Sequence, residues 1–168
     1  MNNHKNKGVT LIELLITIAI VGIFASIALP SFSKLIENNR ISTATNELVA
    51  NMMLARSEAL KRGDTVTMCP STDQDTCNAT DPSLGWVVFL DCTDSTDPNC
   101  QKVIIKVGDG FDSVDVSTFD EISFGFSGRP TGGLQTLTVK GKQGNSELEK
   151  TVILSRIGRV RTESNNES

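Results

Sequence analysis

The stretch Gly8-Val9-Thr10-Leu11-Ile12-Glu13 opens an apolar run that continues to Leu29. The 21 residues from Val9 to Leu29 carry one formal charge, on Glu13. As an α-helix rising ~1.5 Å per residue, this run is about 31 Å long, which is enough to cross a bilayer. A lone carboxylate in such a run costs roughly 3 kcal/mol in lipid on insertion scales. The sequence therefore predicts a membrane-spanning helix and indicates that another group meets Glu13.

Lys7 and the hexapeptide after it resemble the class III leader junction of type IV pilins and pseudopilins. The resemblance implies that a prepilin peptidase cuts between Gly8 and Val9 and that the new N-terminus is methylated. It also implies that Glu13 faces the terminal amine of a neighbouring subunit in the filament. The family usually has Phe after the cut, so Val9 departs from its pattern. A secretory signal peptide or a simple membrane anchor would share the apolar run, but neither predicts Glu13 or the preceding Gly8.

The helix is expected to run from about Val9 to Arg62, past Pro30, a residue that would break or kink an ordinary helix. Apolar residues recur there at spacings of three and four, which predicts one buried stripe. The stripe consists of Ile41, Ala44, Leu48, Met52, Ala55 and Ala59. Lys61-Arg62 followed by Gly63 is typical of a helix C-terminus.

After Gly63 the hydrophobic period changes to two, and turn residues separate the apolar segments. The predicted strands are Thr65–Cys69, Trp86–Leu90, Val103–Val107, Glu121–Phe126, Thr136–Val139, Glu149–Leu154 and Val160–Thr162. The predicted fold class is α+β, with a long N-terminal pilin-type helix packed on an antiparallel β domain. The expected organisation is a leader at 1–8, a transmembrane or filament-core helix at 9–30, an amphipathic helix at 31–63, and a β domain with a basic C-terminal strand or tail at 64–168.

Four cysteines in an exported domain predict two disulfides, for which three pairings are possible. We favour Cys69–Cys77 and Cys92–Cys100, because the two spacings are equal and each bond closes a polar, turn-rich loop. Zinc is a minor alternative, since its ligands usually lie closer together in sequence and an oxidising compartment disfavours it. We therefore expect no metal site.

The sequence supplies little for catalysis. The single histidine, His4, lies in the predicted leader, and the chain has no tyrosine. The acid pairs Asp73/Asp75 and Asp91/Asp94 could serve acid–base chemistry or bind calcium, but solvated turns are the commoner use of such loops. We expect no catalytic residue, no cofactor and no enzyme activity.

Charge is split along the chain, although the net charge is −4. Eleven acidic and two basic residues lie between positions 64 and 120, whereas seven basic and two acidic residues lie between positions 128 and 161. Within the basic third, Gly158-Arg159-Val160-Arg161 would place both arginines on one face of a strand, about 6.5–7 Å apart. That spacing suits successive phosphates of a nucleic acid. A basic edge strand that discourages sheet pairing explains the same residues.

Four further motifs occur in the order found in a known family. They are Gly85-Trp86-Val87-Val88-Phe89, Ile122-Ser123-Phe124, Gly128-Arg129-Pro130 and Gly158-Arg159-Val160-Arg161. Together they resemble the GspH/FimT-type minor pilins and pseudopilins, and Cys69-Pro70-Ser71 leans toward the FimT side, which belongs to type IV pili.

In FimT-type minor pilins a C-terminal G-R-x-R is associated with DNA binding. The resemblance thus implies that Arg159 and Arg161 bind DNA. The weaker candidates for the same role are Arg156, Lys140 and Lys142, the last two flanking Gly141 at an expected hairpin tip. Arg129 is expected to be structural, and Trp86 and Phe89 are expected in the core.

The expected function is that of a minor type IV pilin that binds extracellular DNA for uptake in natural transformation. Binding would rest on weak phosphate contacts that are independent of sequence. The other expected partners are major and minor pilins, the prepilin peptidase and the bacterial inner membrane. The chain would cross that membrane once, with a periplasmic domain, before it joins a pilus at the cell surface. The alternative is a structural minor pseudopilin of type II secretion that does not bind DNA.

Glu13→Ala tests the assembly role of this carboxylate. Because Glu13 lies in the apolar stem, we expect the variant to retain the melting temperature of the wild-type β domain. Incorporation into filaments should fall, since the partner amine loses its counter-charge. Quantifying the subunit in sheared pili measures this effect, and wild-type levels of the variant would contradict the assignment.

Overall fold

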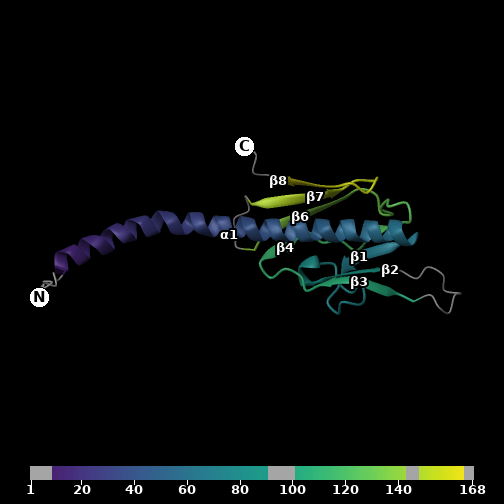
Figure 1. The fold of residues 1–168 in the computed structure, drawn as a ribbon, viewed down its shortest axis with the longest axis horizontal. Helices are drawn as coiled ribbons and strands as arrows, with labels where there is room; N and C mark the ends of the chain where they lie inside the picture. The colour runs from purple at the N-terminus through teal and green to yellow at the C-terminus, as the bar shows by residue number, and fades with distance from the viewer. Residues whose placement is uncertain (1–8, 91–100, 143–147, 165–168) are drawn as a thin grey trace, which may run out of the picture. The chain divides into compact units, whose positions relative to one another are not determined.

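The computed structural model describes residues 9–90, 101–142 and 148–164 (Figure 1). One long helix, α1, spans Leu11–Arg62. The strands and the short 3-10 helix that follow are β1 Val66–Pro70, η1 Pro82–Leu84, β2 Trp86–Leu90, β3 Val103–Gly108, β4 Val114–Val116, β5 Ile122–Phe124, β6 Gln135–Gly141, β7 Glu149–Leu154 and β8 Val160–Ser164. The chain divides into two compact units, Met1–Ile36 and Glu37–Ser168.

In the first unit, α1 leaves its large apolar side chains exposed. Val9 and Phe24, for example, are 72% and 69% exposed, and Phe32 and Leu35 continue this pattern beyond the predicted end of the stem. By length and composition, α1 contains a segment able to cross a membrane. The helix does not break at Pro30, which therefore costs it one backbone hydrogen bond but does not end it.

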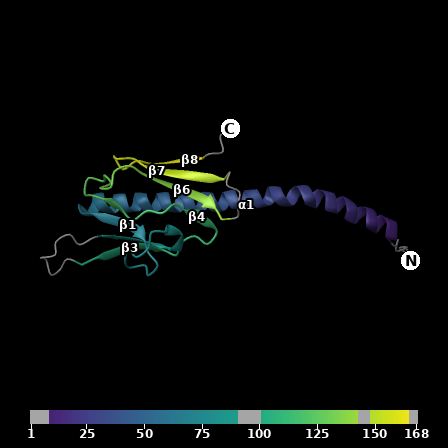
Figure 2. The same cartoon turned by 180° about the vertical axis from the view of Figure 1, so that it is seen from behind.

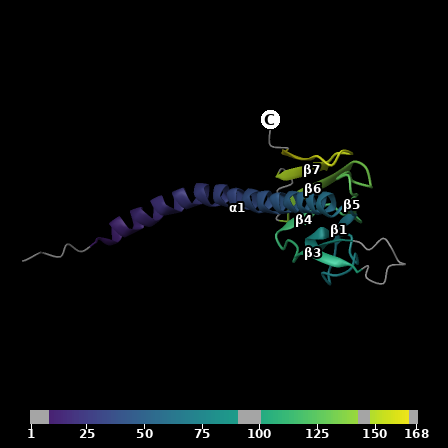
Figure 3. The ribbon, with the colours of Figure 1, turned by 45° about the vertical axis from the view of Figure 1, so that its right-hand side comes forward.

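In the second unit, the predicted apolar stripe of α1 is buried as expected. All six stripe residues, from Ile41 to Ala59, are at most 2% exposed. They meet two four-stranded antiparallel sheets with the strand orders β3-β2-β1-β5 and β4-β6-β7-β8. Strands β6 and β7 appear on one side of this part of α1 and strands β1 and β3 on the other (Figure 3), and β1 and β6 flank it when seen from behind (Figure 2). The α+β class is confirmed.

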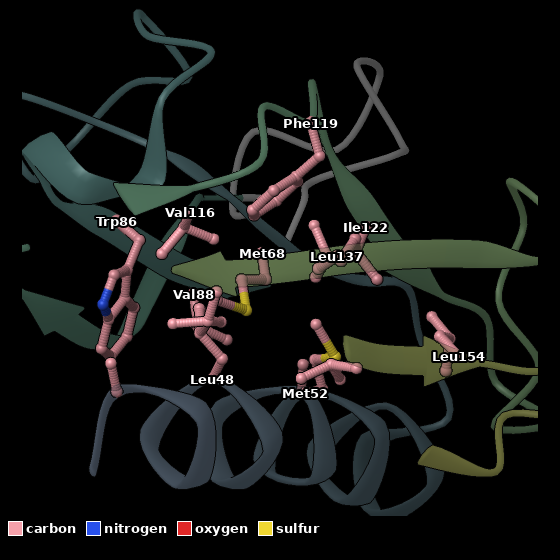
Figure 4. Packing of buried hydrophobic residues seen from close by; sticks show 14 of the residues in the cluster. Leu48, Met52, Met68, Trp86, Val88, Val116, Phe119, Ile122, Leu137 and Leu154 are labelled. Carbon is pink, nitrogen blue, oxygen red and sulfur yellow. The ribbon is translucent and has the colours of Figure 1, made fainter. Parts of the chain in front are cut away.

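The core joins the helix to both sheets. Leu48 and Met52 of α1 lie among Met68 and Val88 of the first sheet and Leu137 and Leu154 of the second (Figure 4). Because these side chains share one apolar cluster, α1 fixes where each sheet lies in the second unit.

Two aromatic residues that the sequence assigned to the core are buried. Trp86 is 0% exposed, and its indole lies where a side chain on Gly108 would be. Phe89 is 7% exposed and forms a separate small cluster with Cys69 and Val87. The ammonium of Lys102 lies 4.4 Å from the centroid of the Phe89 ring.

The strands differ from the prediction by one or two residues at β1, β3 and β8 and more clearly in three other places. β4 was not predicted, because Val114-Asp115-Val116 is too short to show an alternating pattern. β5 ends at Phe124, before the predicted end, because a tight turn begins at Gly125. β6 extends to Gly141, so Lys140 lies within a strand and not at a hairpin tip.

The disulfide Cys69–Cys77 is confirmed, with 5.5 Å between the two Cα atoms. Cys92 and Cys100 lie outside the described residues, so their bond stays a prediction. Because Cys69 and Cys77 are joined, Cys92–Cys100 is the one intramolecular disulfide that the other two cysteines can form.

Asp73 organises the loop that this disulfide closes. Its carboxylate accepts hydrogen bonds from the Thr76 hydroxyl (2.7 Å), the backbone N–H groups of Thr76 (2.8 Å) and Asp75 (2.9 Å), and the Ser71 hydroxyl (2.8 Å). These bonds, chiefly those from Thr76, hold the pKa of Asp73 well below its ordinary value of 3.8. Its oxygens are thus used in fixing the turn.

Asp73→Asn tests this carboxylate. A depressed folded-state pKa means that the stabilisation is present above the ordinary value of 3.8 and is lost as pH falls through the folded-state pKa. We expect the variant to be less stable than the wild type at neutral pH, and the difference to narrow in strong acid. Thermal unfolding at both pH values measures it. Asp75→Asn, which removes an exposed pair with Lys102, is the control and should change little. A difference that does not depend on pH would contradict the assignment.

Candidate nucleic-acid interface

The chain makes the same five-residue turn twice, at residues 125–129 and 155–159. In each turn the first N–H donates to the fifth carbonyl, over 3.0 Å from Gly125 to Arg129 and 2.9 Å from Ser155 to Arg159. The fourth N–H donates back to the first carbonyl, over 2.8 Å and 2.9 Å. The fourth residue is glycine in both, with φ of +70° at Gly128 and +78° at Gly158, a conformation that other residues adopt at a cost. We call these two segments the twin turns.

Arg56 of α1 ties the twin turns together. Its Nε donates to the Gly128 carbonyl over 3.0 Å, and its Nη2 donates to the Ile157 carbonyl over 3.4 Å. Gly158 lies against the same Gly128 carbonyl so closely that a side chain would overlap it. The second turn, between β7 and β8, lies at the end of the unit where α1 ends (Figure 1). Contacts of the helix and of both glycines therefore place the turns side by side.

Each glycine is followed directly by an arginine, so the turns bring Arg129 and Arg159 to one end of the domain, together with Arg156. All three residues are exposed. Among the residues that the structure describes, none of these three guanidinium groups forms an ion pair. The twin turns therefore carry three cations that no described carboxylate neutralises.

The other predicted cations differ, because each lies beside a carboxylate. The pairs are Lys140 with Glu149 at 3.0 Å, Lys142 with Asp115 at 3.9 Å, and Arg161 with Glu163 at 3.2 Å. These ion pairs balance charge on the second sheet and in the turn that follows β6. A phosphate arriving there would meet a carboxylate next to each of these three cations.

The Gly-Arg-Val-Arg motif has part of the expected geometry. Val160 packs against the core, so strand alternation places Arg161 on the outer face, paired in register with Ile153. Arg159 precedes β8 and belongs to the turn, where its N–H donates to the Ser155 hydroxyl over 3.0 Å. The two arginines thus lie on different local structures.

The acidic part of the domain contains a cavity of about 810 Å³. Asp81, Asp120 and Glu121 are among the residues that line it. Its charge opposes phosphate binding, so the cavity is a poor candidate for a nucleic-acid site.

The predicted processing and assembly residues lie at the start of the chain. Gly8 is outside the described residues. Val9 is exposed, and Glu13 is exposed in the first turn of α1, where its N–H donates to the Thr10 hydroxyl over 3.3 Å. Cleavage at Gly8 and the role of Glu13 stay predictions.

The sequence analysis did not single out Arg56, and it expected Arg129 to be structural. The backbone of Arg129 does serve the turn, as expected, but its side chain is exposed beside the predicted site. A signal was present in the sequence: Gly128-Arg129 and Gly158-Arg159 share a dipeptide at the end of matching turns.

Two family models match the chain: Type II transport protein GspH over residues 44–158 and the prokaryotic N-terminal methylation motif over residues 3–29. The fold is similar to that of the type IV minor pilin FimU of Pseudomonas aeruginosa (strain PAO1), with 19% identity, a TM-score of 0.60, and coverage of 78% of this chain and 93% of that one. It is also similar to the minor pseudopilin EpsH from the Type 2 Secretion System of Vibrio cholerae, with 13% identity, a TM-score of 0.51, and coverage of 76% and 99%.

Curated relatives match shorter stretches. The type IV major pilin protein PilA of Myxococcus xanthus (strain DK1622) is 48% identical over 48 residues, which are 29% of this chain and 22% of that protein. The fimbrial protein EcpB of Eikenella corrodens is 41% identical over 70 residues, or 42% and 43% of the two chains. The chain thus spans less than half the length of these relatives. The GspH model, however, covers well over half of the chain, which therefore belongs to the GspH family.

Proposed function

We propose that this protein is a minor pilin of a type IV pilus that binds extracellular DNA for uptake in natural transformation. The observation that carries the proposal is the convergence of Arg156 and Arg159 with Arg129 on the twin turns, with no described carboxylate pairing them. A guanidinium presents a planar fork of donors that fits phosphate oxygens. Three such groups at one end of a net acidic domain favour contact with a phosphate backbone, independent of sequence.

The remaining sequence-predicted cations have a secondary role in this proposal. Arg161, Lys140 and Lys142 lie in exposed ion pairs, which are individually weak and can be exchanged for a phosphate. Their carboxylate partners stay in place, however, and repel the same phosphate. We therefore rank Arg159 and Arg156 first, add Arg129, and place the three paired cations behind them.

Assembly into a filament completes the proposal. A prepilin peptidase cuts after Gly8, the mature chain crosses the inner membrane once with its domain in the periplasm, and Glu13 meets the terminal amine of a neighbouring pilin. Few cations per subunit imply weak binding per subunit. Contacts from several subunits along one DNA molecule raise the affinity by avidity.

A structural pseudopilin of type II secretion is the second candidate function. The match to the GspH family model and the similar fold of EpsH favour it. In this role the domain would contact other pseudopilins and would not bind DNA, so DNA binding by the wild-type protein separates the two candidates.

Arg156→Gln combined with Arg159→Gln tests the proposed site. Glutamine keeps polarity and most of the length while removing two positive charges, and exposed substitutions normally change stability by less than about 0.5 kcal/mol. Each lost phosphate contact should reduce the slope of log affinity against log salt by about 0.9 on duplex DNA, so the pair should reduce it by nearly two. Fluorescence anisotropy with two unrelated duplexes measures this change, which should be alike on both.

The matched control is Lys140→Gln combined with Arg161→Gln, which removes the same charge from paired positions. The slope of log affinity against log salt should change less in this control than in the Arg156/Arg159 variant. Equal binding by the wild type and the Arg156/Arg159 variant would remove this site from the proposal. No binding by the wild type at low salt would favour the secretion pseudopilin.

A further inference from the structure

The twin turns also expose apolar side chains beside their arginines. Phe126 and Ile157, one on each turn, are 73% and 63% exposed. Leu60 of α1, which is 52% exposed, lies under the first turn, with its Cγ 3.0 Å from where a side chain on Gly128 would begin. The end of the domain is therefore both cationic and apolar.

The turn itself does not require the aromatic ring of Phe126. The equivalent position of the second turn holds Arg156, and the two turns have the same pair of backbone hydrogen bonds. Packing does not require the ring either, because Phe89, Phe119 and Phe124 of the same unit are all at most 9% exposed while Phe126 lies in water. A ring that serves neither the backbone nor the core is available to a ligand.

We propose that the twin turns bind single-stranded DNA, with an unstacked base resting on the ring of Phe126 and adjacent phosphates held by Arg129 and Arg159. This inference rests on the DNA binding proposed above. A duplex hides the faces of its bases in the stack and offers chiefly phosphates, whereas a single strand offers both phosphates and base faces. Every base has such a face, so stacking keeps the binding independent of sequence.

Charge favours a nucleic acid over a protein as the occupant of this surface. The three exposed guanidiniums of Arg129, Arg156 and Arg159 belong to the same two turns as Phe126 and Ile157, and no described carboxylate pairs them. A neighbouring pilin would have to bring several carboxylates to the rim of one small apolar contact. A single strand of DNA supplies the anions and the apolar faces in one repeating unit.

Phe126→Ala in the full chain, held in micelles of a non-ionic detergent, tests the inference. Anisotropy is measured with a labelled single strand of mixed sequence and with the duplex of the same sequence. Loss of one stacked base should weaken single-strand binding about tenfold and leave duplex binding unchanged within about twofold. Leu84→Ala removes another exposed apolar side chain, beside Asp81, and should change neither affinity.

Phe126→Trp supplies a readout that a structural role would not affect. The variant should keep the single-strand affinity, and its new indole emission should be quenched by the single strand and not by the duplex. Trp86, the one native tryptophan, is buried, and its signal in the wild type provides the reference.

The outcomes separate the inference from the function on which it rests. Duplex and single-strand binding that are both unchanged in Phe126→Ala, or both weakened equally, would overturn the inference and leave the proposed function standing. Absence of quenching would overturn it as well. Unchanged DNA binding with poorer incorporation into pili would assign the surface to a neighbouring pilin. If the wild type bound neither the single strand nor the duplex, the proposed function itself would fail.

Discussion

Six side chains of α1, from Ile41 to Ala59, are removed from water together, and they face both sheets at once. Neither sheet has another long helix against which to bury its apolar face within the described residues. Burial of this stripe therefore stabilises the helix and sets the positions of the two sheets in the same step. Its large members, such as Leu48 and Met52, lie between side chains of both sheets, so shortening them would loosen both contacts.

The candidate site follows from the same packing. Arg56 lies on α1 three residues before the stripe ends at Ala59, and its guanidinium reaches the Gly128 and Ile157 carbonyls. The contact between Gly158 and the Gly128 carbonyl needs a residue without a side chain. In this arrangement the Gly-Arg dipeptide has two roles: its glycine permits the approach of the turns, and its arginine presents charge to solvent. Arg56 acts as a positioning residue, because its Nε and Nη2 donate hydrogen bonds to backbone carbonyls of the two turns.

The sequence was sufficient for the helix, the buried stripe, most strands and one disulfide, because these depend on local period and spacing. Val114–Val116 was missed, since three residues carry too little pattern, and Pro30 did not end the helix as an isolated rule would suggest. Arg161 and Glu163 lie two residues apart on one strand, whereas the ion pair of Lys140 with Glu149 could not be predicted, because only the folded sheet brings those two side chains together. For the same reason the three arginines that no described carboxylate pairs appear as a set only after folding has joined the twin turns.

Chemical footprinting of arginine tests this account most directly. Phenylglyoxal modifies accessible guanidiniums, and mass spectrometry of the digested full chain reports the extent at each position. Saturating DNA should protect Arg129, Arg156 and Arg159 from modification. Two exposed arginines are the controls: Arg40, and Arg62, whose Nε donates to Glu58 over 2.7 Å. Both should react to the same extent with and without DNA. Equal modification of the three twin-turn arginines with and without bound DNA, or protection confined to Arg161, would contradict the account.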